Sequence, residues 1–160
     1  MKKPLIVYFS LSDNGSTSKV ASFISDGVGG DLFRIVPKKD YSKDDNELLI
    51  ETKKEYQDAA RPELLSFLDD ISNYDVIFFV YPLWWNTLPM PFFTFIDHYD
   101  FKDKKIVPFC TNQGGGIGFS ARELRNVCTN AQVMSGYGIN ASEVEQERDN
   151  IIKWAIENLE

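Results

Sequence analysis

Two continuous apolar runs dominate the pattern of hydrophobic and polar positions along the chain. One covers residues 5–9 (LIVYF) and the other covers residues 76–80 (VIFFV). Runs rich in β-branched and aromatic residues, without polar alternation, are typical of strands buried on both faces of a parallel sheet. Pro82 cannot donate to a strand ladder, so the second strand is predicted to end at about Tyr81.

Shorter apolar runs predict the remaining strands. The run at residues 31–36 contains Arg34 and ends before Pro37, which suits a strand at the edge of a sheet. A further strand is predicted over residues 106–110. A short last strand region is predicted over residues 132–134 and 138–139.

Helical spacing fills the segments between these strands. Apolar residues recur three and four positions apart after residue 16, and Ser16 or Thr17 is placed to cap that helix. The charge-rich stretch from about Asp44 to Ala59 predicts a solvated helix, and residues 88–99 predict an apolar one. Two capping boxes predict the starts of the last two helices: Ser120 with Glu123, and Ser142 with Glu145.

Strand and helix therefore alternate five times. Right-handed crossovers then predict an α/β fold in which helices cover both faces of a five-stranded parallel sheet. At 160 residues, without repeats or linkers, the chain is expected to form one domain over residues 1–160.

The stretch from residue 76 to residue 96 contains no charged side chain, so a membrane span is an alternative. Prolines at 82, 89 and 91 and the polar pair Asn86-Thr87 interrupt any continuous helix there. No lysine or arginine flanks the stretch to set an orientation. A strand, a loop and a helix account for it better.

Composition narrows the classes of function. A formal charge of −7 argues against nucleic acid as a partner. His98 is the single histidine, and Cys110 and Cys128 lack metal-ligand spacing, so we expect neither a metal site nor a catalytic residue of the serine–histidine type. The residues after Met1 lack the features of a signal peptide, and a cytoplasmic location is expected.

Three loops carry the candidate chemistry. Residues 10–17 (SLSDNGST) place four hydroxyl side chains between a buried strand and a helix N-terminus. Capping alone needs one or two of them, so we favour an anion site formed by hydroxyls and backbone N–H groups without lysine or arginine. Trp84 and Trp85 follow the central strand and suggest a flat ligand. Residues 114–118 hold four glycines, which let backbone approach a ligand.

In a doubly wound sheet of order 2-1-3-4-5, these three loops follow strands one, three and four, whose ends meet at the switch point. A phosphate nest, an aromatic wall and a glycine-lined edge match the parts of FMN. The glycine loop also fits a dinucleotide fingerprint weakly, through Gly116, Gly118 and Ala121. It follows the wrong strand for that motif.

At these motifs the sequence resembles the flavodoxin family, particularly its short members. The match is most specific over residues 81–91 (YPLWWNTLPMP) and 108–112 (PFCTN) with the glycines that follow. The resemblance implies a flavodoxin-like three-layer sandwich with FMN as cofactor. The first loop carries about two more residues than the family pattern, which leaves open which hydroxyls reach the phosphate.

The resemblance also implies the site residues. The FMN phosphate would be held by Ser10, Ser12, Asn14, Gly15, Ser16 and Thr17. The isoalloxazine ring would lie against Pro82, Leu83, Trp84, Trp85 and Asn86, with Trp85 favoured as the stacking ring. Its other edge would touch Thr111, Asn112, Gln113, Gly114, Gly115 and Gly116.

A low-potential electron carrier is the function that this resemblance favours, since the cofactor supplies the chemistry and the protein tunes it. Its partner would be a redox protein with a basic docking surface, and the chain would be a monomer or a weak homodimer without a membrane partner. The alternative is an FMN-dependent NAD(P)H or quinone reductase, which would be a dimer. A backbone carbonyl near Asn86 is a candidate acceptor for the flavin N5–H group.

Overall fold

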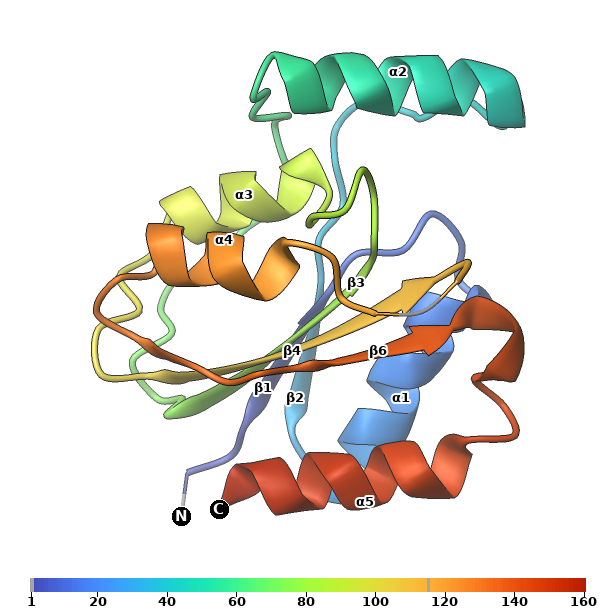
Figure 1. Ribbon diagram of the computed structural model, residues 1–160. Helices are drawn as coiled ribbons and strands as arrows, with labels where there is room; N and C mark the ends of the chain where they lie inside the picture. The colour runs from blue at the N-terminus through green and yellow to red at the C-terminus, as the bar shows by residue number, and fades with distance from the viewer. Residues whose placement is uncertain (1, 115) are drawn as a thin grey trace.

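A computed structural model describes residues 2–114 and 116–160 of the chain (Figure 1). Its strands are β1 (Leu5–Tyr8), β2 (Asp31–Arg34), β3 (Val76–Pro82), β4 (Lys105–Asn112), β5 (Gln132–Val133) and β6 (Tyr137–Asn140). Its helices are α1 (Ser16–Val28), α2 (Asp45–Gln57), α3 (Met90–Asp97), α4 (Ser120–Val127) and α5 (Arg148–Leu159), with a short 3₁₀ helix, η1 (Ala141–Glu143), before α5.

All strand pairs in the sheet are parallel, and the order β2-β1-β3-β4-β5 confirms the predicted order 2-1-3-4-5. The fifth position holds two segments, because β5 pairs with the first part of β4 and β6 pairs with the last part. Gly136 lies between them with a φ of +80°, and a Cβ there would meet the carbonyl oxygen of Pro108 at 2.8 Å. Only glycine fits that bend.

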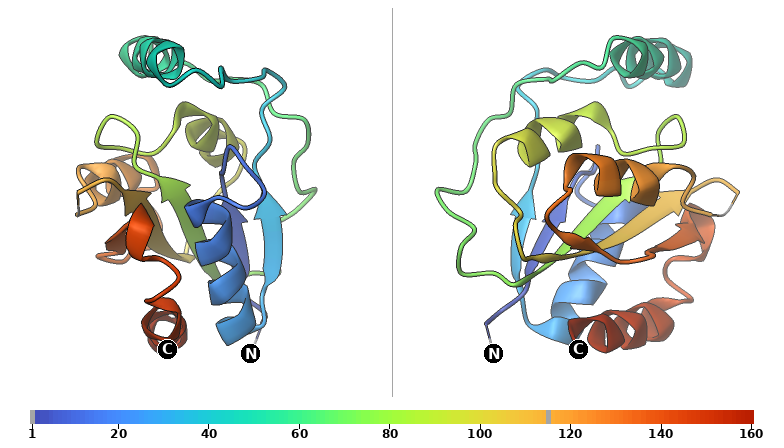
Figure 2. Two further views of the ribbon diagram at one scale, coloured as in Figure 1. Left: turned by 90° about the vertical axis from the view of Figure 1, so that its right-hand side faces the viewer. Right: turned by 60° about the vertical axis from the view of Figure 1, so that its left-hand side comes forward.

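The sheet separates two cores. Alternate side chains along a strand point to opposite faces, so Val7 and Phe79 enter one core while Ile6 and Phe78 enter the other. Figures 1 and 2 show α3 and α4 on the first face and α1 and α5 on the second. This is the predicted three-layer arrangement.

Strand β3 lies at the centre of the sheet, between β1 and β4. Residues 77–81 are each 0% exposed, which confirms a strand buried on both faces. Pairing extends one residue beyond the prediction, because Pro82 lies opposite Thr111 in β4 and the next N–H, from Leu83, donates to the Thr111 carbonyl at 2.8 Å. Pro82 lacks an N–H donor, but the strand includes it all the same.

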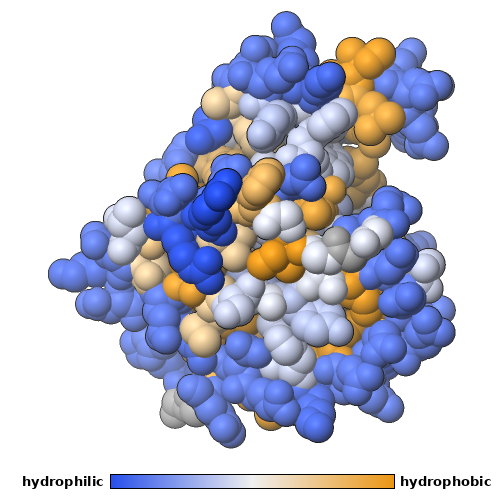
Figure 3. All heavy atoms as spheres, in the orientation of Figure 1, coloured by the Kyte–Doolittle hydropathy of each residue, from blue (hydrophilic) through white to orange (hydrophobic). Residues whose placement is uncertain are grey.

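Helix α2 confirms the predicted solvated helix. Only Thr52 and Glu55 are buried along it, and Asp44 caps it by accepting from the Glu47 N–H at 3.0 Å. The helix lies above the remaining layers in Figures 1 and 2, and in the same orientation Figure 3 shows it overhanging the body of the protein. None of the helices within the described residues is long and apolar enough to cross a bilayer.

The predicted capping roles of the serine and threonine side chains are wrong. Gly15 is the N-cap of α1, and no side chain caps that end. Ser120 lies inside α4, where its hydroxyl donates to the Ile117 carbonyl at 2.6 Å and lies 2.7 Å from the Tyr81 hydroxyl. Ser142 belongs to η1, which Asn140 caps, and α5 begins later. Thr17 and Ser120 use their hydroxyls in contacts with Thr111, Tyr81 and the Ile117 carbonyl instead.

Candidate functional site

Three loops meet at the carboxyl edge of the sheet, as predicted: residues 9–15 after β1, residues 83–89 after β3 and residues 113–119 after β4. They are neighbours because β3 pairs with both β1 and β4. The first and third are joined at their bases by Thr17 and Thr111, whose buried hydroxyl oxygens lie 2.8 Å apart. The second and third are joined at their tips, where the Phe119 N–H donates to the Asn86 carbonyl at 2.7 Å.

The first loop is braced by its own hydroxyls. The side chains of Ser10 and Ser18 both donate to the Ser12 carbonyl oxygen at 2.8 Å. A Cβ at Gly15 would meet the Ser12 hydroxyl oxygen at 2.9 Å, so the loop closes tightly where it enters α1. The side chains of Ser12, Asn14 and Ser16 make no hydrogen bond to another described residue. Among the predicted phosphate ligands, these side chains are therefore available to bind an anion.

Arg34 is the residue that sequence reasoning missed here. One guanidinium nitrogen donates to the Ser10 carbonyl at 2.9 Å, and another pairs with the Asp13 carboxylate. Arg34 therefore lies beside the loop, and the prediction that hydroxyls and backbone N–H groups bind an anion without lysine or arginine stays a prediction. The sequence does show an arginine within a mainly apolar predicted strand, which is unusual. It does not show that the side chain of Arg34 would point from the edge strand β2 toward this loop.

The second loop is a two-residue hairpin turn. Trp84 and Thr87 exchange backbone hydrogen bonds of 3.0 and 3.1 Å, and the two residues between them have positive φ, +55° for Trp85 and +65° for Asn86. This is the geometry of a type I′ turn, in which asparagine is favoured. A backbone carbonyl near Asn86 is the predicted acceptor for the flavin N5–H group. The carbonyl of Asn86 itself already accepts from the Phe119 N–H and retains one lone pair.

The two tryptophans of this loop lie in different environments. Trp84 packs edge-on against Phe9 and Tyr41, with ring centroids 5.2 and 5.6 Å away. Trp85 reaches α2, where its indole N–H donates to the Thr52 hydroxyl at 3.0 Å. Both rings are half-buried. The favoured stacking role of Trp85 stays a prediction.

The third loop is shaped by Asn112 at the end of β4. Its side-chain amide donates to the Gly116 carbonyl at 2.8 Å and accepts from the Gly114 N–H at 3.1 Å. Gly118 has a φ of +56°, and a Cβ there would meet the Asn86 carbonyl oxygen at 2.5 Å. Glycine at this position is therefore what allows the second and third loops to touch.

The other predicted site residues are placed as follows. Thr17 and Thr111 are buried against each other, Ser10 and Asn112 are nearly buried, Leu83 is half-buried, and Gln113 is exposed. Pro82 ends β3. Gly115 lies outside the described residues.

Both cysteines are poor candidates for redox chemistry. Burial raises the pKa of the Cys110 thiol to about 12 and that of Cys128 to about 11. The thiols therefore stay protonated at neutral pH and behave as small buried hydrophobic groups. Within residues 2–114 and 116–160, no three histidine, cysteine or acidic side chains gather as a metal site would require.

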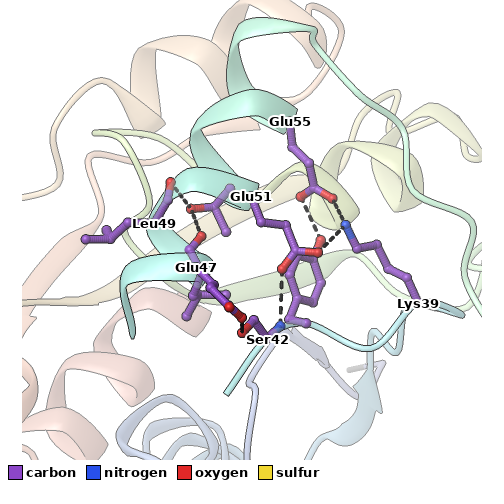
Figure 4. Close-up of polar contacts among 9 residues, drawn as sticks. Lys39, Ser42, Glu47, Leu49, Glu51 and Glu55 are labelled. Atoms are coloured by element: carbon purple, nitrogen blue, oxygen red, sulfur yellow. Dashed lines mark hydrogen bonds and ion pairs between the residues drawn. The ribbon is translucent and has the colours of Figure 1, made fainter. Parts of the chain in front are cut away.

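A polar network anchors α2 beside the site (Figure 4). The Glu55 carboxylate accepts from the Lys39 ammonium at 2.7 Å and from the Tyr41 hydroxyl at 2.8 Å. The Glu51 carboxylate accepts from Lys39 at 2.9 Å and from the Ser42 N–H at 3.2 Å. Because Tyr41 packs on Trp84, this network ties the helix to the tryptophan loop.

A cavity of about 550 Å³ opens between the first loop, the segment that leaves β2, and the first half of α2. We refer to it as the β2–α2 cavity. Its lining includes Ser10, Leu11, Arg34, Val36, Lys43 and Leu48. Sequence reasoning did not find this cavity, because its walls come from three segments that the fold brings together.

Comparison with known proteins identifies relatives over the whole chain. The family model described as "Flavodoxin" matches residues 3–158. A candidate flavoprotein from Bacteroides eggerthii is 32% identical, with a TM-score of 0.78, over 94% of this chain and 98% of that one. A second, from Bacteroides uniformis, is 29% identical, with a TM-score of 0.82, over 96% and 97%.

A third solved structure, a flavoprotein from Lactobacillus acidophilus in complex with FMN, is 24% identical, with a TM-score of 0.71, over 91% of this chain and 98% of that one. At that identity the likeness concerns the fold. No curated protein matches the chain at a significant level.

Proposed function

The chain belongs to the flavodoxin family, and from this premise we propose that it binds FMN at the three loops and carries electrons between redox partners. The observation that carries the proposal is the joining of these loops by the Thr17–Thr111 and Asn86–Phe119 contacts at one edge of the sheet. A bound flavin supplies one- and two-electron transfer.

The residues of the first loop fit a phosphate group. The first N–H groups of α1 receive no side-chain cap, and the helix dipole adds a partial positive charge there. Asn14 and Ser16 offer uncommitted side chains beside these N–H groups. Arg34 holds the loop from outside through the Ser10 carbonyl. We infer that Arg34 positions the loop and that backbone N–H groups bind the phosphate.

The other two loops fit the ring. Trp84 and Trp85 supply flat surfaces, and the glycine loop offers backbone groups with no side chain in the way. A net charge of −7 disfavours adding negative charge to a bound flavin, which lowers its reduction potential. This direction suits a low-potential carrier.

An acidic carrier needs a partner with a basic docking surface. Asp13 in the first loop and Glu123 in α4 are acidic, and Leu11 and Phe119 are exposed on the same two segments. Association with such a partner should slow as salt is added, because screening weakens long-range attraction. We propose that the carrier works as a monomer or a weak homodimer.

The test of the FMN site is a titration of the apoprotein with FMN, followed by absorption. Asn14→Asp should weaken FMN binding by about tenfold or more, since it sets a like charge beside the phosphate. Asn126→Asp makes the same charge change on the exposed face of α4 and should bind like the wild type. A protein that takes up no FMN, or equal affinities in both variants, contradicts this assignment.

One observation favours the second candidate function, a reductase that uses NAD(P)H or quinones. The β2–α2 cavity has a volume typical of small-molecule sites and lies next to the first loop. Steady-state oxidation of NAD(P)H with a quinone separates the two candidates. A carrier shows negligible turnover until a reductase is added, whereas a reductase turns over alone.

A further inference from the structure

The β2–α2 cavity gathers cations in a protein whose net charge is −7. Arg34, Lys39 and Lys43 line it, with Asp40 and Asp45 as its acidic residues. Lys43 makes no ion pair or hydrogen bond to another described residue. Arg34 is paired with Asp13, and Lys39 is paired with Glu51 and Glu55. Lys43 is therefore the cation of the lining that no described acidic group pairs with.

Arg34 is a second cation of the cavity that can bind a ligand. Its ion-pair partner Asp13 has a side chain that is 85% exposed, and exposed pairs contribute little, about 0–1 kcal/mol. Its Nε is buried and has no hydrogen-bond partner among the described residues. A buried donor without an acceptor is unfavourable, so an anion that satisfies this guanidinium is favoured.

The lining of the cavity also contains apolar side chains. Phe9, Leu11, Val36 and Leu48 line it, and Leu11 and Val36 are exposed hydrophobic side chains, at 47% and 38%. A cavity lined by apolar and cationic side chains suits a ligand that combines a flat ring with a phosphate. Ser10 and Ser42 belong to the same lining.

We propose that the β2–α2 cavity binds a nucleotide phosphate, with its phosphate toward Arg34 and Lys43 and its base against Leu11 and Val36. Its lining includes Ser10 and Leu11 of the first loop and no residue of the tryptophan or glycine loops. Phe9 and Tyr41 of the lining pack against Trp84.

This proposal adds a substrate class to the second candidate function, the reductase. It rests on the proposed FMN site only in so far as a reductase needs bound FMN; nucleotide binding itself does not depend on that site. Binding is measured by isothermal titration calorimetry with AMP, adenosine and inorganic phosphate, on protein saturated with FMN. AMP should bind with one site per chain. Adenosine lacks the charge and phosphate lacks the ring, so each should bind at least about fivefold more weakly than AMP.

Two variants place the ligand in the cavity. Lys43→Gln should weaken AMP binding by about threefold, as expected for loss of a partly exposed charge pair. Val36→Asp sets a like charge in the cavity and should weaken it by about tenfold or more. Lys54→Gln on α2 and Leu32→Asp on β2 make the same changes outside the cavity and should leave AMP binding unchanged.

FMN affinity should stay the same in all four variants, which separates this site from the three-loop site. Failure of the protein to take up FMN overturns the proposed function, and the AMP titration on the flavin-free protein still tests the cavity. Competition by NADH shows whether the nucleotide is part of a dinucleotide, and its absence assigns the cavity to a mononucleotide. The proposal is overturned if AMP does not bind at about 10 mM, or if Lys43→Gln and Val36→Asp both bind AMP as tightly as the wild type.

Discussion

Helices α1 and α2 have the same length, 13 residues, and are held in place by different forces. Helix α1 buries Val20, Ala21 and Ile24 in the core that it shares with α5. Helix α2 buries only Thr52 and Glu55, and its exposed side chains include Leu49 and Ile50. Nonpolar burial fixes α1 on the sheet, whereas hydrogen bonds and ion pairs fix α2 beside the tryptophan loop.

The difference bears on function because each helix supports a different part of the site. The N-terminus of α1 forms the end of the phosphate loop, so its position needs to be constant. Helix α2 forms a wall of the β2–α2 cavity and contacts Trp85. A helix held by a few polar contacts detaches at lower cost than one held by a core, and its position depends on solution conditions.

The largest expected effect tests the nonpolar half of the comparison. Ile24→Ala removes a side chain that is 0% exposed and should lower the free energy of unfolding by about 2–5 kcal/mol. Leu49→Ala on α2, where the side chain is 55% exposed, should change it by about 0.5 kcal/mol or less. Urea unfolding followed by circular dichroism measures both. Similar losses in the two variants would mean that α2 is packed as tightly as α1.

A smaller effect tests the polar half. Glu55→Ala leaves the Lys39 ammonium and the Tyr41 hydroxyl without the acceptor that both use. The expected loss is about 1–3 kcal/mol, the cost of leaving a buried polar partner unsatisfied. Glu47→Ala removes an exposed carboxylate of the same helix, whose side-chain contact is with the Ser42 hydroxyl and not with Lys39 or Tyr41, and serves as the matched control.

The position of α2 gives a second measurement for these variants. Amide hydrogen exchange across residues 45–57 should quicken in Glu55→Ala and should stay unchanged across α1. Equal exchange in Glu55→Ala and Glu47→Ala would show that the Glu55 network does not anchor the helix.

Local patterns in the sequence were sufficient to predict the strands and the solvated helix α2, and the doubly wound fold class supplied the strand order. These features depend on residues that are close in the sequence and on general rules of sheet topology. The loops that follow β1, β3 and β4 meet because that order requires it.

Contacts between distant residues could not be predicted in this way. Arg34 reaches the Ser10 carbonyl across 24 positions of the chain, and Thr17 meets Thr111 across 94. Ser120 fits a capping box with Glu123, but the folded chain places its hydroxyl against Tyr81. A local capping rule fails where a buried partner competes for the same hydroxyl.

The smallest expected effect is a pH dependence of the attachment of α2 to the rest of the protein. Burial acts to raise the pKa of the Glu51 carboxyl, but hydrogen bonds from Lys39 and the Ser42 N–H outweigh it and hold the pKa below its usual 4.5. Burial acts to lower the pKa of Lys39, but its bonds to Glu55 and Glu51 outweigh it and raise the pKa above 10.5. Both charges are therefore favoured by the fold at neutral pH.

The direction of the pH effect follows from these two shifts. A lowered carboxyl pKa stabilises the fold above pH 4.5, and this contribution is lost as the pH falls through the folded-state value. A raised lysine pKa stabilises it below pH 10.5, and that contribution is lost as the pH rises through the folded-state value. Each is about 0.2–1 kcal/mol, because the pair is partly exposed.

The indole N–H of Trp85 reports the attachment of α2 directly, since it donates to Thr52 on that helix. Its NMR signal, assigned with Trp85→Phe, should hold its position between about pH 5 and 10 and shift as the pH falls below 4.5. Thr52→Val removes the acceptor and gives the position of the unbonded indole at every pH. A signal that keeps its neutral-pH position after the Glu51 carboxyl has been protonated, well below its usual pKa of 4.5, would mean that packing against the tryptophan loop holds α2 without its charges. The contrast with α1 would then be one of degree.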